Sequence, residues 1–165
     1  MNTKKDLETL GFKGFIAVKD LKNHNSAIPR TNGVYAVVRL CKSHPKFLEK
    51  GTGGFFKDRN PNVDVLTLEK KWVDGTEILY IGKAGGGTSS STLYKRIKQY
   101  LDFGSGKKVG HWGGRYIWQL QDSDDLYFCW KETQTGNMPR EEETSLITIF
   151  KESHEGKLPF ANLTE

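Results

Sequence analysis

Residues 33–40 (GVYAVVRL) constrain the fold more than any other stretch, because they are apolar almost without interruption. A strand of this composition has both faces covered, so it is predicted in the interior of a sheet. A second strand is predicted within residues 77–84 (EILYIGKA), whose branched and aromatic side chains suit a half-buried pleated surface. Each strand carries a tyrosine, Tyr35 or Tyr80, and the second runs into a glycine-rich loop that bears Lys83. Taken alone, the two stretches are equally explained as core strands followed by turns, since most loops bind nothing.

The remaining pattern predicts one domain over residues 1–165, a length that a single hydrophobic core can serve. Residues 1–30 are interpreted as a mixed lead-in, in which residues 14–18 are a candidate short strand. Residues 41–76 contain turn chemistry and are interpreted as an insertion between two adjacent strands of one sheet. The other predicted elements are a helix over 62–72 capped by Asn62, a helix over 93–103, a strand over 126–130 and a last helix with Pro139 in its first turn.

The composition narrows the class of protein. Hydrophobic residues make up 36% and charged residues 27% of the chain, and no apolar run approaches the length that crosses a bilayer. We expect no secretory signal, because no apolar run follows the first lysines. Cys41 and Cys129 lie far apart, which fits neither a disulfide scaffold nor a cysteine metal site. A reducing, cytoplasmic location is therefore expected.

Positive charge is concentrated in one segment of a chain whose net charge is +5. Between Lys95 and Arg115 the only acid is Asp102, and tyrosines and tryptophans alternate with the cations. Such a segment is typical of a surface that binds a polyanion, although a solvated basic face is the equal alternative. The residues predicted to contact nucleic acid are Lys95, Lys98, Lys107, Lys108 and Arg115.

Two charged residues are predicted to point inward. Arg96 flanks the apolar stripe of the helix over 93–103, and Glu143 precedes Leu146, Ile147 and Phe150 by three, four and seven residues. Acids in a first helical turn also favour the helix dipole, which is the simpler explanation of this glutamate. A carboxylate on an apolar face, however, needs a cation, which is either a side chain or a metal ion.

These residue types suit the hydrolysis of a phosphodiester bond. One carboxylate can anchor a hydrated Mg²⁺ ion, and an arginine can neutralise a phosphoryl oxygen. A tyrosine near an activated water can help to deprotonate it. The glycines at 85–87 match neither a phosphate-binding P-loop nor a dinucleotide fingerprint, and the sequence has no His-Glu-x-x-His.

The same residues occur in an ordered set that resembles the signature of the GIY-YIG endonuclease family. The set comprises Gly33-Val34-Tyr35, Tyr80-Ile81-Gly82, Arg96, Glu143 and Asn162, and it spans most of the chain. The resemblance implies an α+β domain with a small, mainly antiparallel three-stranded central sheet flanked by helices. It also implies cleavage of nucleic acid, usually DNA, with one Mg²⁺ or Mn²⁺ ion in each active site.

The resemblance further implies a role for each matching residue. Glu143 would bind the metal ion, and Tyr35 would act as the general base or assist it. Tyr80 would orient water or the substrate phosphate. Arg96 would stabilise charge that develops on the phosphate, and Asn162 would support the site.

The family pattern also suggests three further candidate residues, and the chain departs from it in two places. Tyr100 stands four residues after Arg96, where some family members have histidine, so Tyr100 and the nearby His111 are further candidates for a catalytic role. Lys83 is a candidate for a phosphate contact. The insertion over 41–76 replaces the short turn of many members, and no long DNA-binding domain is appended.

The first hypothesis is thus a cytoplasmic, stand-alone endonuclease acting on DNA, with RNA left open, as a monomer or a homodimer and without a membrane partner. A second hypothesis is a non-catalytic nucleic-acid-binding module of the same fold. A third is a small metabolic or scaffold domain in which the tyrosines and the arginine are polar residues of the core.

Overall fold

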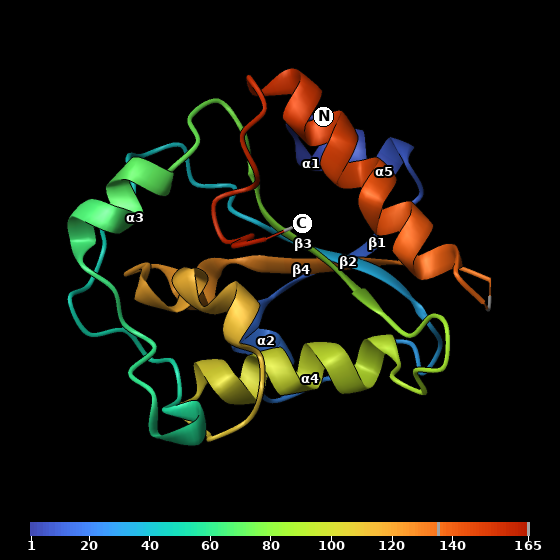
Figure 1. Ribbon diagram of the computed structural model, residues 1–165, viewed down its shortest axis with the longest axis horizontal. Coiled ribbons are helices and arrows are strands. Elements are labelled where there is room, and N and C mark those ends of the chain that lie inside the picture. Colours follow the sequence, from blue (N-terminus) through green and yellow to red (C-terminus); the bar gives the residue numbers. More distant parts are fainter. Residues whose placement is uncertain (135, 165) are drawn as a thin grey trace.

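The computed structural model describes residues 1–134 and 136–164 and has an α+β fold (Figure 1). Its centre is an antiparallel sheet with the strand order β1-β4-β2-β3. The strands are β1 (Lys13–Ala17), β2 (Gly33–Val38), β3 (Ile78–Ala84) and β4 (Tyr127–Glu132). As residues 33–40 predict, β2 is an interior strand, and all six of its residues are buried.

Helices cover both faces of the sheet (Figure 1). One face packs against α1 (Lys4–Thr9) and α5 (Met138–Ser153), and the other packs against α2 (Val18–Leu21) and α4 (Leu93–Gly104). The second face is completed by two 3₁₀ segments, η2 (Trp112–Gln119) and η3 (Ser123–Asp125). The connection from β2 to β3 contains η1 (Phe56–Asp58) and α3 (Val65–Lys71). Within the described residues, no helix is both long and apolar enough to span a bilayer.

The alternation of side chains along β2 divides the core into two clusters. Tyr35 and Val37 belong to the cluster beneath α4, whereas Val34, Ala36 and Val38 belong to the cluster beneath α5. This confirms the two faces that alternation predicts for this strand. The tyrosine side of β2 therefore faces the helix that carries Arg96.

The prediction of three strands is wrong, because residues 13–17 of the lead-in form a fourth strand that pairs with β4. The pairing is irregular between Gly14 and Ile16, and Phe15 has a φ of 53°. A bulge of this kind breaks the alternation of buried and exposed side chains, so residues 14–18 carry only a weak strand pattern. The strand also begins one residue earlier than the pattern indicates.

Two further predictions need correction. The strand expected over 33–40 ends at Val38, and the next residue, Arg39, donates through Nε to Asp122 at 2.8 Å in a partly buried ion pair. The helix expected over 62–72 starts at Val65, with Asp64 and not Asn62 at its N-cap. The Asn62 side chain instead accepts a hydrogen bond from the Gly51 backbone at 2.8 Å, and so closes a loop of the insertion.

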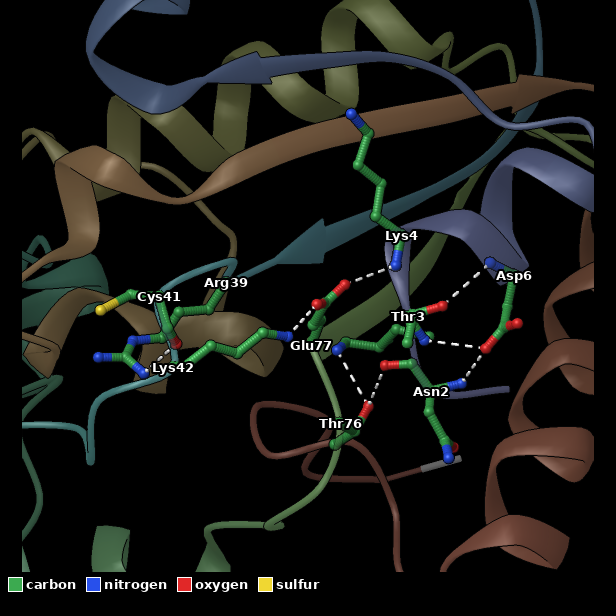
Figure 2. A network of polar contacts seen from close by, with 10 residues as sticks. Asn2, Thr3, Lys4, Asp6, Arg39, Cys41, Lys42, Thr76 and Glu77 are labelled. Atoms are coloured by element: carbon green, nitrogen blue, oxygen red, sulfur yellow. Dashed lines mark hydrogen bonds and ion pairs between the residues drawn. The ribbon is translucent and has the colours of Figure 1, made fainter.

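The strand β3 lies at the edge of the sheet, and its first part is tied to distant parts of the chain. At its start, Glu77 accepts a hydrogen bond from the Lys4 backbone at 2.7 Å and pairs with Lys42 (Figure 2). Along its free edge, the Ala161 backbone donates to the Leu79 carbonyl at 2.8 Å. The contact from Ala161 satisfies a backbone group that an exposed edge strand leaves unpaired.

Candidate active site

A pocket of about 320 Å³ is lined by residues from the end of β3 and from the first turns of α4 and α5. Figure 1 shows that the end of β3 lies between the starts of these two helices. Five of the residues singled out in the sequence line it together. They are Tyr35, Tyr80, Lys83, Arg96 and Glu143. The two strands supply the tyrosines, β3 supplies the lysine, and one helix from each face of the sheet supplies the arginine and the glutamate.

The two tyrosines meet over a glycine. Tyr35 lies opposite Gly82 in the pairing of β2 with β3, and the ring centroids of Tyr35 and Tyr80 are 5.9 Å apart. A Cβ atom on Gly82 would lie 2.7 Å from the Tyr80 ring and 2.9 Å from the Tyr35 ring. Only glycine therefore leaves room for both rings on this side of the strand.

His111 and Tyr100 form a layer behind the tyrosines. Nε2 of His111 is hydrogen-bonded to the Tyr35 hydroxyl at 2.8 Å, and the His111 ring stacks parallel to the Tyr100 ring, with their centroids 3.6 Å apart. Both side chains are fully buried, and neither lines the pocket. The Tyr100 hydroxyl is itself used, since it donates to the Gly114 carbonyl. Tyr100 is thus placed to hold His111, and His111 is placed to act through Tyr35.

Burial sets the protonation of this layer. It raises the pKa of Tyr35 well above its ordinary value, and the neighbouring Tyr80 adds to the rise. Burial, together with the charge of Arg96, holds the pKa of His111 well below its ordinary 6.5. At neutral pH Tyr35 is consequently a protonated phenol and His111 a neutral imidazole. A neutral imidazole has one ring nitrogen that can accept a proton.

The Arg96 guanidinium is held in place by hydrogen bonds to two neutral groups. One of its terminal nitrogens, Nη1, donates to the Gln99 side chain at 2.7 Å and to the Gly110 carbonyl at 3.3 Å. Within residues 1–134 and 136–164, no carboxylate forms an ion pair with this guanidinium. A positioned cation without a counterion, at the wall of a pocket, is suited to bind an anion.

Glu143 occupies the inward side of α5, as its spacing predicts. Its neighbour Glu142 pairs with Lys131 at 2.6 Å and Glu141 is exposed, whereas Glu143 is half-buried and has no ion pair in the described part of the chain. Burial raises the pKa of the Glu143 carboxyl, and the charges of Lys83, Arg96 and Arg140 oppose the rise without cancelling it. The carboxylate therefore lacks a compensating cation in direct contact.

The pocket fits a divalent ion that keeps most of its water shell. No group of three or more histidine, cysteine, aspartate or glutamate side chains is gathered for a metal anywhere in the described ranges, so a protein-only cage is not formed there. A lone carboxylate with adjoining space suits Mg²⁺, which takes one or two protein carboxylates and completes its shell with water and phosphate oxygens. Glu143 is the residue that would hold such an ion.

Asn162 supports the site from outside the pocket. Its side chain is buried and bonds to both backbone groups of Ile81, between Tyr80 and Gly82. The prediction that Asn162 supports the site thus corresponds to a structural contact with β3 and not to a side chain in the pocket.

Sequence reasoning missed Ser89 and Ser91, which also line the pocket. The run Ser89-Ser90-Ser91-Thr92 predicts an N-cap for the following helix, and Thr92 takes that role, since its hydroxyl accepts from the Lys95 backbone at 3.2 Å. Two hydroxyls on a glycine-rich loop beside an arginine are phosphate-binding groups, and that combination was the available signal.

The five residues predicted to contact nucleic acid have different environments. Lys98 and Lys107 both pair with Asp102, at 2.7 and 3.0 Å, and Lys108 pairs with Asp58 at 3.0 Å. Lys95 is exposed on α4, one residue before Arg96. Arg115 stacks on Trp112, with 4.4 Å from Cζ to the ring centroid. The structure places these residues along α4 and the segment that follows it, and not inside the pocket.

A larger cleft, of about 420 Å³, lies at the other end of β3 and contains Cys41 (Figure 2). Its charged groups are already engaged. Arg39 donates to Asp122 and to the carbonyls of Cys41 and Ser43, and Lys42 pairs with Glu77. This cleft contains a structural network that joins the N-terminus to the insertion, in which Arg39, Lys42 and Glu77 are held in ion pairs.

Comparison with known protein families, with curated proteins and with solved structures finds no match to this chain.

Proposed function

We propose that this protein is an endonuclease that hydrolyses phosphodiester bonds in DNA with the aid of a divalent metal ion. The proposal is supported by one observation above all. Tyr35, Tyr80, Lys83, Arg96 and Glu143 come from four separate elements and line one pocket. The fold proposed with this activity is that of the GIY-YIG nucleases, with a fourth strand added by residues 13–17.

The charges in the pocket favour a phosphodiester over a neutral substrate. Arg96 and Lys83 lie at its wall without a carboxylate partner among the described residues, so a phosphate would supply the missing anion. Arg96 would stabilise negative charge as it develops on the phosphate oxygens. The hydroxyls of Ser89 and Ser91 would orient the same group.

The metal ion, held by Glu143, would polarise the phosphate and lower the pKa of a bound water. The protein's own residues would remove the proton from the attacking water. Tyr35 would take a proton from the attacking water while it passes its own hydroxyl proton to Nε2 of His111, 2.8 Å away. This exchange avoids a buried tyrosinate, which the raised pKa of Tyr35 disfavours.

The test is cleavage of supercoiled plasmid, branched DNA and RNA, with Mg²⁺ or Mn²⁺ and with a chelator. The expected result is metal-dependent nicking of DNA that Glu143→Gln abolishes. Glu141→Gln is the matched control, because this glutamate lies on the same helix and is exposed. Equal activity of wild type and Glu143→Gln would overturn the metal assignment. DNA binding without cleavage of any substrate would favour the non-catalytic module.

A further inference from the structure

The connection between β2 and β3 contributes an arginine to a cluster that the active-site residues do not explain. Arg59 follows η1, and its Cζ atom lies 4.3 Å from the centroid of the Trp112 ring. Arg115, from η2, lies over the same ring at 4.4 Å. Two guanidinium groups from distant parts of the chain are therefore held against one indole by cation–π contacts.

Neither guanidinium has a carboxylate partner within residues 1–134 and 136–164. Arg115 donates through Nη1 to the Trp112 carbonyl at 3.1 Å, while its buried Nε has no hydrogen-bond partner in this part of the chain. Burial lowers the pKa of Arg115, and the charge of Arg59 acts in the same direction. Two like charges gathered in this way cost free energy that a bound anion would recover.

The surroundings add to the positive charge. Lys57 lies 5.4 Å from the centroid of the Phe56 ring, and Lys108 lies nearby through its pair with Asp58 at 3.0 Å. Asp58 is thus already engaged by a lysine, as Asp102 is further along. The local surface presents more cations than carboxylates.

This cluster is continuous with the active-site pocket. Arg96, at the wall of the pocket, donates to the Gly110 carbonyl at 3.3 Å. Phe56 of η1 packs on the same glycine, where an added Cβ atom would lie 3.2 Å from its ring. Lys57 follows Phe56 directly, and Arg59 follows two residues later, after Asp58. Gly110 therefore connects Arg96 of the pocket with the segment of the insertion that carries Lys57 and Arg59.

We propose that Arg59, Trp112 and Arg115 form a clamp, here called the Trp112 clamp, that binds phosphate groups of a nucleic-acid strand whose scissile bond lies in the pocket. This inference rests on the proposed function. Guanidinium groups suit phosphate oxygens because they donate two parallel hydrogen bonds. The indole carries two arginines and so orders them, in place of stacking with a base. The clamp thus adds affinity but reads no sequence.

The repeated charge of a nucleic-acid backbone fits this arrangement better than an acidic protein surface does, because cations stand both at the wall of the pocket and in the clamp. The Trp112 clamp also gives a role to the insertion over 41–76, which supplies Arg59. A family member with a short turn in place of this segment would lack the contact of Arg59 with the nucleic acid.

The test is binding of a short fluorescent DNA duplex in the presence of a chelator, measured by anisotropy over a range of salt concentrations. The variants are Arg59→Gln with Arg115→Gln, and Arg59→Gln alone, which alters an exposed side chain and leaves η2 intact. The control removes two equal charges from exposed sites elsewhere, as Lys5→Gln with Lys13→Gln. Thermal unfolding checks that each variant folds.

We expect the double arginine variant to bind about tenfold more weakly or worse, and its plot of log affinity against log salt to be shallower by about 1 per lost phosphate contact. Arg59→Gln alone should show about half of the change in slope. An equal loss in the lysine control would overturn the clamp, since net charge would then explain the effect. Tighter, arginine-dependent binding of polyglutamate than of DNA would overturn the assignment to nucleic acid.

Failure of the clamp and failure of the nuclease are distinguishable, because the binding assay contains no metal ion and requires no cleavage. Arginine-dependent binding without nuclease activity would retain the clamp and reject the proposed reaction. Metal-dependent cleavage with unchanged binding of the arginine variants would retain the reaction and reject the clamp.

Discussion

The side chain of Asn162 pairs with the main chain of Ile81 as a neighbouring strand would. Its Oδ1 accepts from the Ile81 N–H at 2.9 Å, and its Nδ2 donates to the Ile81 carbonyl at 2.8 Å. Ile81 stands between Tyr80 and Gly82 on the edge strand β3. One amide thus satisfies both free backbone groups of the residue that lies between Tyr80 and Gly82.

Replacing Asn162 by aspartate should keep the first of these hydrogen bonds and remove the second. The carboxylate cannot donate to the Ile81 carbonyl, and leaving a buried acceptor unpaired costs about 1–3 kcal/mol of unfolding free energy. Urea unfolding measures this loss. Asn23→Asp, at an exposed residue, is the control and should change stability by less than about 0.5 kcal/mol. Because β3 carries Tyr80, cleavage should fall more than DNA binding does. Unchanged stability and activity would contradict the role of Asn162 in holding β3.

Glu143→Gln should stabilise the folded protein at neutral pH while it abolishes cleavage. The folded-state pKa of Glu143 is raised above its ordinary 4.5, so its contribution to stability is present below that value and is lost as pH rises through the folded-state pKa. A neutral amide does not incur that loss. Thermal unfolding at neutral pH, without metal ions, measures the difference between the two proteins.

The same variant tests the metal site by linkage. At ten times its dissociation constant, a ligand that binds only the folded state stabilises it by about 1.4 kcal/mol. Mg²⁺ or Mn²⁺ should therefore raise the unfolding temperature of the wild type and of Glu141→Gln, and should leave Glu143→Gln unchanged. An equal rise in all three proteins would place the ion elsewhere.

His111 should make the protein sensitive to acid. Its folded-state pKa lies well below the ordinary 6.5, so the stability it contributes is present above 6.5 and is lost as pH falls toward the folded-state value. Glu143 acts with the opposite sign, because burial raises its pKa above the ordinary 4.5. His111→Phe keeps a ring against Tyr100 but cannot be protonated. Its stability should fall less than that of the wild type below pH 6.5, as urea unfolding across this range will show.

The same substitution separates a packing role from a proton-accepting role. If His111 accepts the proton of Tyr35, cleavage by the wild type should decline on the acid side as the imidazole becomes protonated. His111→Phe should then show a low rate without that decline. A variant that cleaves at the wild-type rate with the same pH profile would leave His111 with packing alone.

Much of the site follows from local sequence rules. Alternation along residues 33–38 assigns Tyr35 to its face, and helical spacing assigns Arg96 and Glu143 to inward positions. These rules operate within one element, and they hold here because each element has a strong apolar face. The choice of which inward residues share a pocket came from the resemblance and not from the periodicity.

The contacts that escape prediction are those between segments far apart in the chain. Nothing in the loop around His111 indicates that its ring reaches Tyr35, which lies 76 residues earlier. The stacking of Arg59 on Trp112 likewise depends on how the insertion folds back toward α4. The sequence does predict a short strand over residues 14–18, but its pairing with β4 is another contact between distant segments that no local pattern indicates.

Gly82→Ala should damage the site more than it damages the fold. An alanine Cβ atom would lie 2.7 Å from the Tyr80 ring and 2.9 Å from both Cζ and the hydroxyl of Tyr35, so at least one ring must move. Overpacking a buried position costs about 1–3 kcal/mol, which an intact domain tolerates. Displacing Tyr35 would, in addition, stretch its 2.8 Å hydrogen bond to His111.

The expected result for Gly82→Ala is therefore a folded protein that binds DNA through the Trp112 clamp but cleaves it at least about a hundredfold more slowly, the scale of a 1 Å misplacement at a reacting group. Gly75→Ala is the matched control, since this glycine lies just before β3 with nothing within 4 Å of its added Cβ atom, although its φ of +76° costs some stability. Cleavage by Gly75→Ala should stay near the wild-type rate even if its unfolding temperature falls. Equal loss of cleavage in both variants would indicate that β3 as a whole, and not the meeting of the two tyrosines, controls the rate.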